Sequence, residues 1–215
     1  MDPIRGWFVE DRGRRAAEAL KKRDFNAQYV ETQDQAKEMI LEEVPPGAIV
    51  GVGGSVTIRE MKVLEDLRAR GHKVLDHWEI PRSALEESFQ MRRAQQVCDV
   101  FLTSSNAITQ DGRLVNTDGS GNRVNAMTFG PKKAIVVAGI NKIVPDLERA
   151  LRRIKEVAVP LNCRRLNYSP PCIQAGKCVD CRVPQRSCRI TTIIEWKPPF
   201  ISDYLVIIVG ENLGY

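Results

Sequence analysis

The sequence predicts an α/β fold, in which a mostly parallel sheet carries helices on both faces. Two observations support this. Helical and strand patterns alternate through the first half of the chain, and several strand patterns are continuous apolar runs of the kind found in buried strands. With 215 residues the chain is long enough to bury one full core, so we expect a single domain.

The first half contains four helix and strand alternations. Helical patterns cover residues 10–23, 32–44, 55–70 and 83–97, and strand patterns cover residues 26–31, 47–53, 72–78 and 98–105. Thr32 and Ser83 are suitable N-caps for the second and fourth helices. Regular alternation of this kind predicts parallel strands joined by helices.

The second half begins with a hairpin. Asp111 and Gly112 form a turn dipeptide between two short apolar runs, and a glycine-rich stretch follows. A core strand over residues 132–139 precedes a helix over 145–159, with Pro145 in its first turn, and two strands over 191–196 and 204–211 close the chain. We expect one domain over residues 1–215, with 163–190 as a cysteine-rich metal-binding loop inserted before the last strands.

Composition narrows the classes of function. The net charge is +5, but the basic residues are mixed with Glu and Asp, which does not favour nucleic-acid binding. No apolar run is long enough for a membrane span, and the N-terminal residues lack the apolar core of a signal peptide. We therefore expect a cytoplasmic protein that does not bind membranes.

The first glycine-rich loop joins a strand to a helix. It holds Gly51, Gly53, Gly54 and Ser55 within "VGVGGSVTIRE". Small residues allow a ligand to approach the backbone, and free N–H groups at a helix start favour an anion. The spacing matches neither the dinucleotide nor the phosphate-loop motif. The alternative is a tight turn with Ser55 as a simple N-cap.

The second loop, "TSSNAITQDGRLVNTDGSGNRVNAM", is rich in small polar residues. Such residues line hydrogen-bonding pockets more often than they fill cores, although capped surface hairpins use them too. Loops that follow buried parallel strands meet at the crevice where open α/β sheets bind ligands. We therefore predict a small-anion site from both loops, with the second contributing Ser105, Asn106, Asn116, Gly119, Ser120 and Asn122 as ligand-binding residues and Asp118 as the catalytic candidate.

Several motifs together carry a family resemblance. "GVGGSVTIRE", "LTSSNAITQDGRLVNTDGSGNRV", "FGPKKAIVVAGINKI" and "VIIVGENLGY" resemble the LUD-domain family of the lactate-utilization protein C type, in particular a short subgroup with four cysteines near its end. The resemblance covers the chain from about residue 30 onward. It implies a NagB/RpiA/CoA-transferase-like fold, a bacterial role in the oxidation of lactate or another small organic acid, and a homodimer as one oligomeric state.

Candidates for catalysis are few. Asp118 lies among small polar neighbours and is the best acid or base, whereas Glu60 and Lys142 are weaker candidates. Asn106 occupies the position that is Asp in the related phosphosugar isomerases, and an amide cannot shuttle a proton. His72 and His77 flank a predicted strand without ligand spacing, so both are interpreted as structural.

Four cysteines lie close together in the sequence: Cys172, Cys178, Cys181 and Cys188. In a reducing compartment such a cluster is more often a metal or redox site than a set of disulfides. Four thiolates suit zinc or an iron–sulfur cluster, and the resemblance to lactate oxidation favours iron–sulfur. Cys163 could replace one ligand, and Cys98 begins a buried strand as a core residue.

Two classes of function follow. One is a component of organic-acid oxidation that binds a small anionic ligand and works with iron–sulfur oxidoreductase subunits. The other is a non-enzymatic redox or regulatory binding protein, or a relative of the isomerases that binds a phosphosugar or a coenzyme A ester. Whether the chain is an enzyme is left open by its sequence.

Overall fold

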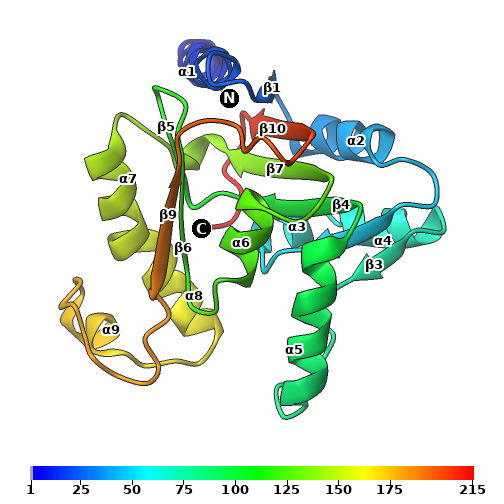
Figure 1. The fold of residues 1–215 in the computed structure, drawn as a ribbon. Coiled ribbons are helices and arrows are strands. Elements are labelled where there is room, and N and C mark those ends of the chain that lie inside the picture. Colours follow the sequence, from blue (N-terminus) through cyan, green and yellow to red (C-terminus); the bar gives the residue numbers. More distant parts are fainter. Residues whose placement is uncertain (1) are drawn as a thin grey trace.

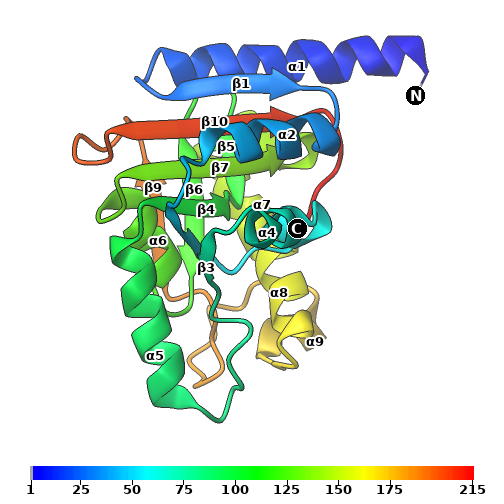
Figure 2. The ribbon, with the colours of Figure 1, turned by 90° about the vertical axis from the view of Figure 1, so that its right-hand side faces the viewer.

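Six parallel strands form the main sheet of the structure, a computed structural model that describes residues 2–215. Their order is β1-β10-β7-β4-β2-β3, and each neighbouring pair is parallel (Figures 1 and 2). The strands are β1 (Asn26–Val30), β2 (Ile49–Val52), β3 (Lys73–Leu75), β4 (Val100–Ser104), β7 (Lys133–Gly139) and β10 (Asp203–Val209). The predicted mostly parallel sheet is confirmed.

A second sheet of four short strands lies across one face of the main sheet. Its order is β8-β5-β6-β9, formed by β5 (Ala107–Thr109), β6 (Leu114–Asp118), β8 (Ile143–Val144) and β9 (Ile190–Ile194). The β5–β6 pair is the predicted hairpin, and Gly112 closes its turn at φ +89°. A side chain at Gly112 would also collide with the backbone of Ala19, 2.6 Å away, so this turn packs directly on the first helix.

Helices cover both faces of the main sheet. Helices α2 (Gln33–Glu43), α3 (Val56–Glu60) and α4 (Val63–Ala69) pack on one face, and α1 (Pro3–Lys21) and α6 (Asn122–Thr128) pack on the other with the second sheet. Alternate residues of β10 face the two cores: Leu205 and Ile207 pack with α2, α3 and α4, whereas Val206 and Ile208 pack with α1, α6 and the second sheet. Helix α5 (Leu85–Ala94) projects from the body (Figure 2).

A third core lies on the outer face of the second sheet. There α7 (Leu147–Arg153), one π-helical turn (Ile154–Ala158) and α8 (Val159–Arg165) cover Ala107 and Val115 (Figure 1). A short α9 (Pro171–Ala175) follows, and residues 176–189 then lead without regular structure to β9.

Local chemistry explains where several helices begin and end. Thr32 and Gln35 form a capping box at α2, and the Ser55 hydroxyl accepts the Ile58 N–H at the start of α3. The single helix predicted over residues 55–70 is wrong, because Lys62 adopts φ +53° and separates α3 from α4.

Other helix boundaries also differ from the prediction. Helix α1 begins seven residues before residue 10, at Pro3, with Asp2 as its N-cap. Helix α5 is capped by Ala84 instead of Ser83, and Asp146 caps α7, which leaves Pro145 outside that helix. Between residues 2 and 215 no helix combines the length and the apolar character that crossing a membrane requires.

Candidate functional site

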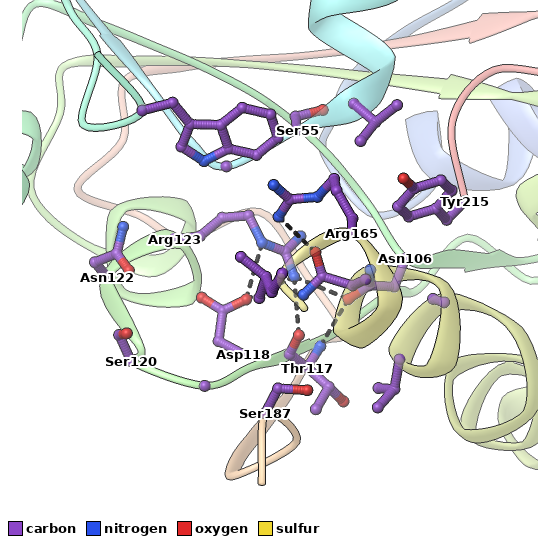
Figure 3. Close-up of a pocket in the computed structure, with 18 of the residues that line it drawn as sticks. Ser55, Asn106, Thr117, Asp118, Ser120, Asn122, Arg123, Arg165, Ser187 and Tyr215 are labelled. Carbon is purple, nitrogen blue, oxygen red and sulfur yellow. Dashed lines mark hydrogen bonds and ion pairs between the residues drawn. The ribbon is translucent and has the colours of Figure 1, made fainter. Parts of the chain in front are cut away.

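A cavity of about 660 Å³ opens at the carboxyl ends of β2 and β4 (Figure 3). The loops after these strands and after β6 form its inner end, and α8 and the segment around Trp78 form its outer end. The two polar loops, which were expected to meet at this edge of the sheet, lie together there.

Most of the predicted site residues line this cavity, and three do not. Lining residues are Gly54, Ser55, Ser105, Asn106, Asp118, Gly119, Ser120 and Asn122. Gly51, in β2, and Gly53, directly after it, instead pack closely against other residues, because a β-carbon at Gly51 would lie 2.7 Å from the Cys98 sulfur and one at Gly53 would lie 2.5 Å from the Thr103 hydroxyl. Asn116 is fully buried and does not line the cavity.

Arg123, in the first turn of α6, holds the inner end together. The residue is 8 % exposed, and each of the five N–H groups of its guanidinium has an oxygen partner, with Asp118 beside it in Figure 3. The acceptors are Asp118 Oδ1 at 2.9 Å, Ser104 O at 2.9 Å, Asn116 Oδ1 at 2.6 Å, Asn106 Oδ1 at 2.8 Å and Thr117 O at 3.2 Å. Arg123 therefore joins the end of β4 to β6 and α6.

Asp118 is fully engaged by this network. Its Oδ1 pairs with Arg123, and its Oδ2 accepts the backbone N–H of Val124 at 3.0 Å. The carboxylate thus positions Arg123 and caps the first turn of α6. Its predicted role as an acid or base stays a prediction, and in this arrangement it would require Arg123 to release it.

The two asparagines of the second loop have a backbone role. Asn116 Oδ1 accepts the N–H of Asn106 at 3.0 Å, and Asn106 Oδ1 accepts the N–H of Thr117 at 2.9 Å. This reciprocal pair fixes the end of β4 against β6. The side-chain amide of Asn106 therefore serves as a structural acceptor.

Lys142 is the basic group at the bottom of the cavity. Its side chain is 3 % exposed, and its Nζ bonds the hydroxyls of Thr57 at 2.7 Å and Ser104 at 2.8 Å. No carboxylate pairs with it among residues 2–215. Burial, followed by the charges of Arg153 and Arg123, lowers the pKa of Lys142 to about 7, and Glu60 opposes the shift.

The remaining predicted titratable residues occupy other positions. Glu60 lies outside the cavity, where its carboxylate accepts the backbone N–H of Gly214 at 2.7 Å. His77 lines the cavity wall and bonds Gln95, and burial lowers its pKa to about 4, so its ring is neutral at pH 7. His72 is buried against the carbonyl of Ala48, in agreement with a structural role.

The cavity is strongly basic. The basic side chains that line it are Arg82, Arg92, Arg123, Lys142, Arg165, Arg186 and Arg189, and the acidic side chain among its described lining residues is Asp118. Within residues 2–215, Arg123 and Arg186 are the members of this set that pair with a carboxylate. The unpaired charges give the cavity a positive potential that favours anions.

Sequence reasoning did not single out Arg123, Trp78 or Arg165. Arg123 had a weak signal, since it is the one charged residue in "GSGNRVNAM". Trp78 had none, and Arg165 had only the short basic run that it forms with Arg164, because both reach the cavity from segments far apart in the sequence.

The cysteines are all free thiols. Cys98 and Cys163 are buried, and Cys172, Cys178, Cys181 and Cys188 are partly exposed. Cys163 lies in α8 and not in the predicted loop, with its sulfur 2.9 Å from the Ser187 hydroxyl. Across residues 2–215 the structure gathers no three Cys, His, Asp or Glu side chains in a metal-binding arrangement. The metal centre stays a prediction.

We expect Arg123→Met to lower the free energy of unfolding by about 3–5 kcal/mol, because it removes the counter-charge of the buried Asp118 carboxylate and the donors to the Ser104 and Thr117 carbonyls. Urea titration followed by circular dichroism measures this loss. Arg152→Met is the control: its pair with Glu156 is exposed and should contribute less than about 1 kcal/mol. Equal effects of the two substitutions would contradict the role assigned to Arg123.

Lys142→Met should change how stability depends on pH. Between pH 7 and the ordinary lysine pKa of 10.5, the unfolded chain binds a proton at Lys142 that the folded chain does not. Stability of the wild type should therefore rise with pH across this window relative to Lys142→Met. Urea titrations of both proteins at several pH values measure the difference, and parallel profiles would show that the lysine titrates normally.

Comparisons with known proteins agree with this fold. A family model described as the LUD domain matches residues 13–209. The fold is similar to the crystal structure of a DUF162 family protein from Deinococcus radiodurans, with a TM-score of 0.56 and 12 % sequence identity over 94 % of this chain and 98 % of that one. No curated protein matches the chain by sequence. Because the family model spans most of its length, the chain belongs to the LUD-domain family.

Proposed function

We propose that this LUD-domain protein binds a small organic anion, such as lactate or another small carboxylic acid, at the inner end of its cavity. The observation that carries the proposal is Lys142, a buried amine with no carboxylate partner in the described chain, which lines a cavity already rich in basic groups. A bound carboxylate would supply the missing counter-charge.

Lys142 is suited to hydrogen-bond the anion, whereas Arg123 is not. Two of the three N–H groups of a protonated Lys142 are used by Thr57 and Ser104, which leaves one for a ligand. Arg123 has no free donor and contributes charge alone. Binding of an anion would favour the charged form of Lys142, so the complex would take up a proton near pH 7.

The arrangement supports a binding role more strongly than a catalytic one. Asp118 is held by Arg123, and His77 has a low pKa and a bond to Gln95. We infer a link to lactate oxidation from the resemblance of this chain to the LUD-domain family of the lactate-utilization type. In that role an iron–sulfur oxidoreductase subunit would be the redox partner, and the anion site would bind the organic acid that is oxidised.

Gly54→Val should abolish binding of lactate and pyruvate without unfolding the chain. A β-carbon at Gly54 would lie 3.1 Å from Trp78 Nε1, so the valine methyl groups would occupy the cavity edge. Isothermal titration calorimetry measures binding, and circular dichroism checks the fold. Gly6→Val is the matched control, since a side chain there meets open space. Unchanged affinity in folded Gly54→Val would place the anion elsewhere.

We also propose that Cys172, Cys178, Cys181 and Cys188 hold one metal centre, with an iron–sulfur cluster ahead of zinc. Four free thiols match the donors of either site. Arg186 donates to the carbonyls of Cys181 and Cys188, at 2.9 and 3.0 Å, and so holds two of these residues near each other. Residues 176–189 would have to rearrange to bring four sulfurs to one point.

Protein purified without oxygen should therefore contain iron and sulfide, or zinc, in a fixed ratio to the chain. Metal analysis with an absorption spectrum measures this. Cys178→Ser should lose the metal, whereas Cys163→Ser, which removes a thiol outside the proposed set, should retain it. Metal-free wild type after anaerobic purification would reject the centre, and the reverse response of the two variants would reject this set of ligands.

A further inference from the structure

The outer end of the cavity holds a second group of basic side chains. Arg165, the last residue of α8, and Arg82, in the segment after β3, both line the cavity, and neither pairs with a carboxylate in the described chain. Arg82 donates to the carbonyl of Leu166 at 2.9 Å, and Arg165 donates to Asn162 Oδ1 at 2.7 Å. These contacts hold the two guanidinium groups in place without neutralising them.

Trp78 brings a third guanidinium to this group. The Arg59 and Arg165 guanidinium carbons lie 3.8 and 4.1 Å from the centre of a Trp78 ring. Arg59 is neutralised by Asp76 at 2.6 Å, whereas Arg165 is not. The buried Nε of Arg165 also has no hydrogen-bond partner. Stacking on Trp78 therefore fixes the plane of an unpaired guanidinium at the cavity wall.

The inner and outer groups are two separate centres of charge. The charged neighbours that act on Lys142 are Arg153, Arg123 and Glu60, whereas those that act on Arg165 are Tyr215, Arg82 and Arg59. Burial lowers the pKa of Arg165, Tyr215 opposes this shift, and Arg82 and Arg59 add to it.

One small acid would not satisfy both centres. A cavity of about 660 Å³ falls in the size range that encloses a drug-sized ligand, whereas lactate has three carbons. Planar guanidinium groups bind phosphoryl oxygens through paired hydrogen bonds, and a dianion offsets more than one positive charge.

We propose that Arg82 and Arg165 form a phosphate subsite, so that the ligand carries a phosphoryl group in addition to the carboxylate at Lys142. This inference rests on the proposed anion site at the inner end. It identifies the ligand class as phosphorylated organic acids, or as organic acids carried by a phosphate-bearing cofactor. Both sources share the chemistry that this subsite would recognise.

Calorimetric titration with lactate, inorganic phosphate, phosphoenolpyruvate, ADP and coenzyme A tests the subsite. Phosphoenolpyruvate, which has both groups, should bind more tightly than lactate or phosphate alone. Arg165→Gln should weaken the binding of phosphoenolpyruvate and phosphate by at least about tenfold, as expected for loss of one charged donor. The affinity for lactate should be unchanged. Arg164→Gln, an exposed neighbour on the same helix, is the matched control.

Tryptophan fluorescence gives a local readout. Trp7 and Trp196 are exposed, so a Trp7→Phe, Trp196→Phe protein reports on Trp78 alone. Phosphate should change its emission, and Arg165→Gln should remove that change while thermal unfolding confirms the fold.

The possible results separate the two proposals. If coenzyme A or ADP binds more tightly than phosphoenolpyruvate and depends on Arg165, the subsite stands and its phosphoryl group comes from a cofactor. Equal binding of lactate and phosphoenolpyruvate, or equal losses for both in Arg165→Gln, overturns the subsite. If lactate fails to bind while phosphate binding still depends on Arg165, the inner site is overturned. The proposal of a ligand with both a carboxylate and a phosphoryl group is then overturned too.

Discussion

The buried guanidinium of Arg123 is the constraint on which the rest of the site depends. From α6 it donates to backbone carbonyls and side-chain oxygens of β4, of Asn106 just after β4, and of β6, so it ties this helix to a strand of each sheet. A charge in a buried position is tolerated when every donor is paired. The same network orients the second polar loop, so the shape of the inner cavity follows from one side chain.

This network also explains why the cavity can be so basic. Asp118 is committed to Arg123 and cannot neutralise Lys142 or the outer arginines. Burial and like charges therefore act on Lys142 with only Glu60 in the described chain to oppose them, and this lowers the stability of the folded chain. Natural proteins place such destabilising charge at functional sites, where ligand binding offsets the loss of folding stability.

Local patterns predicted the architecture well and the chemistry of the site poorly. The alternating elements, the hairpin at Asp111 and Gly112, and the meeting of two loops follow from short-range signals and from the rule for parallel sheets. Lys142 contacts Thr57 and Ser104, which lie 85 and 38 residues away, and no local pattern reports such contacts. Tertiary packing alone distinguishes a buried lysine from an exposed one.

The π-helical turn over residues 154–158 has a geometric consequence for the cavity. A single π turn adds about one residue to a helix, and one residue corresponds to a rotation of about 100°. Helix α8 therefore faces a direction that a continuous α-helix from α7 would not give it. Without this extra residue, Arg165 would point away from Trp78. The length of the helix, and not only its composition, thus determines which charges reach the ligand.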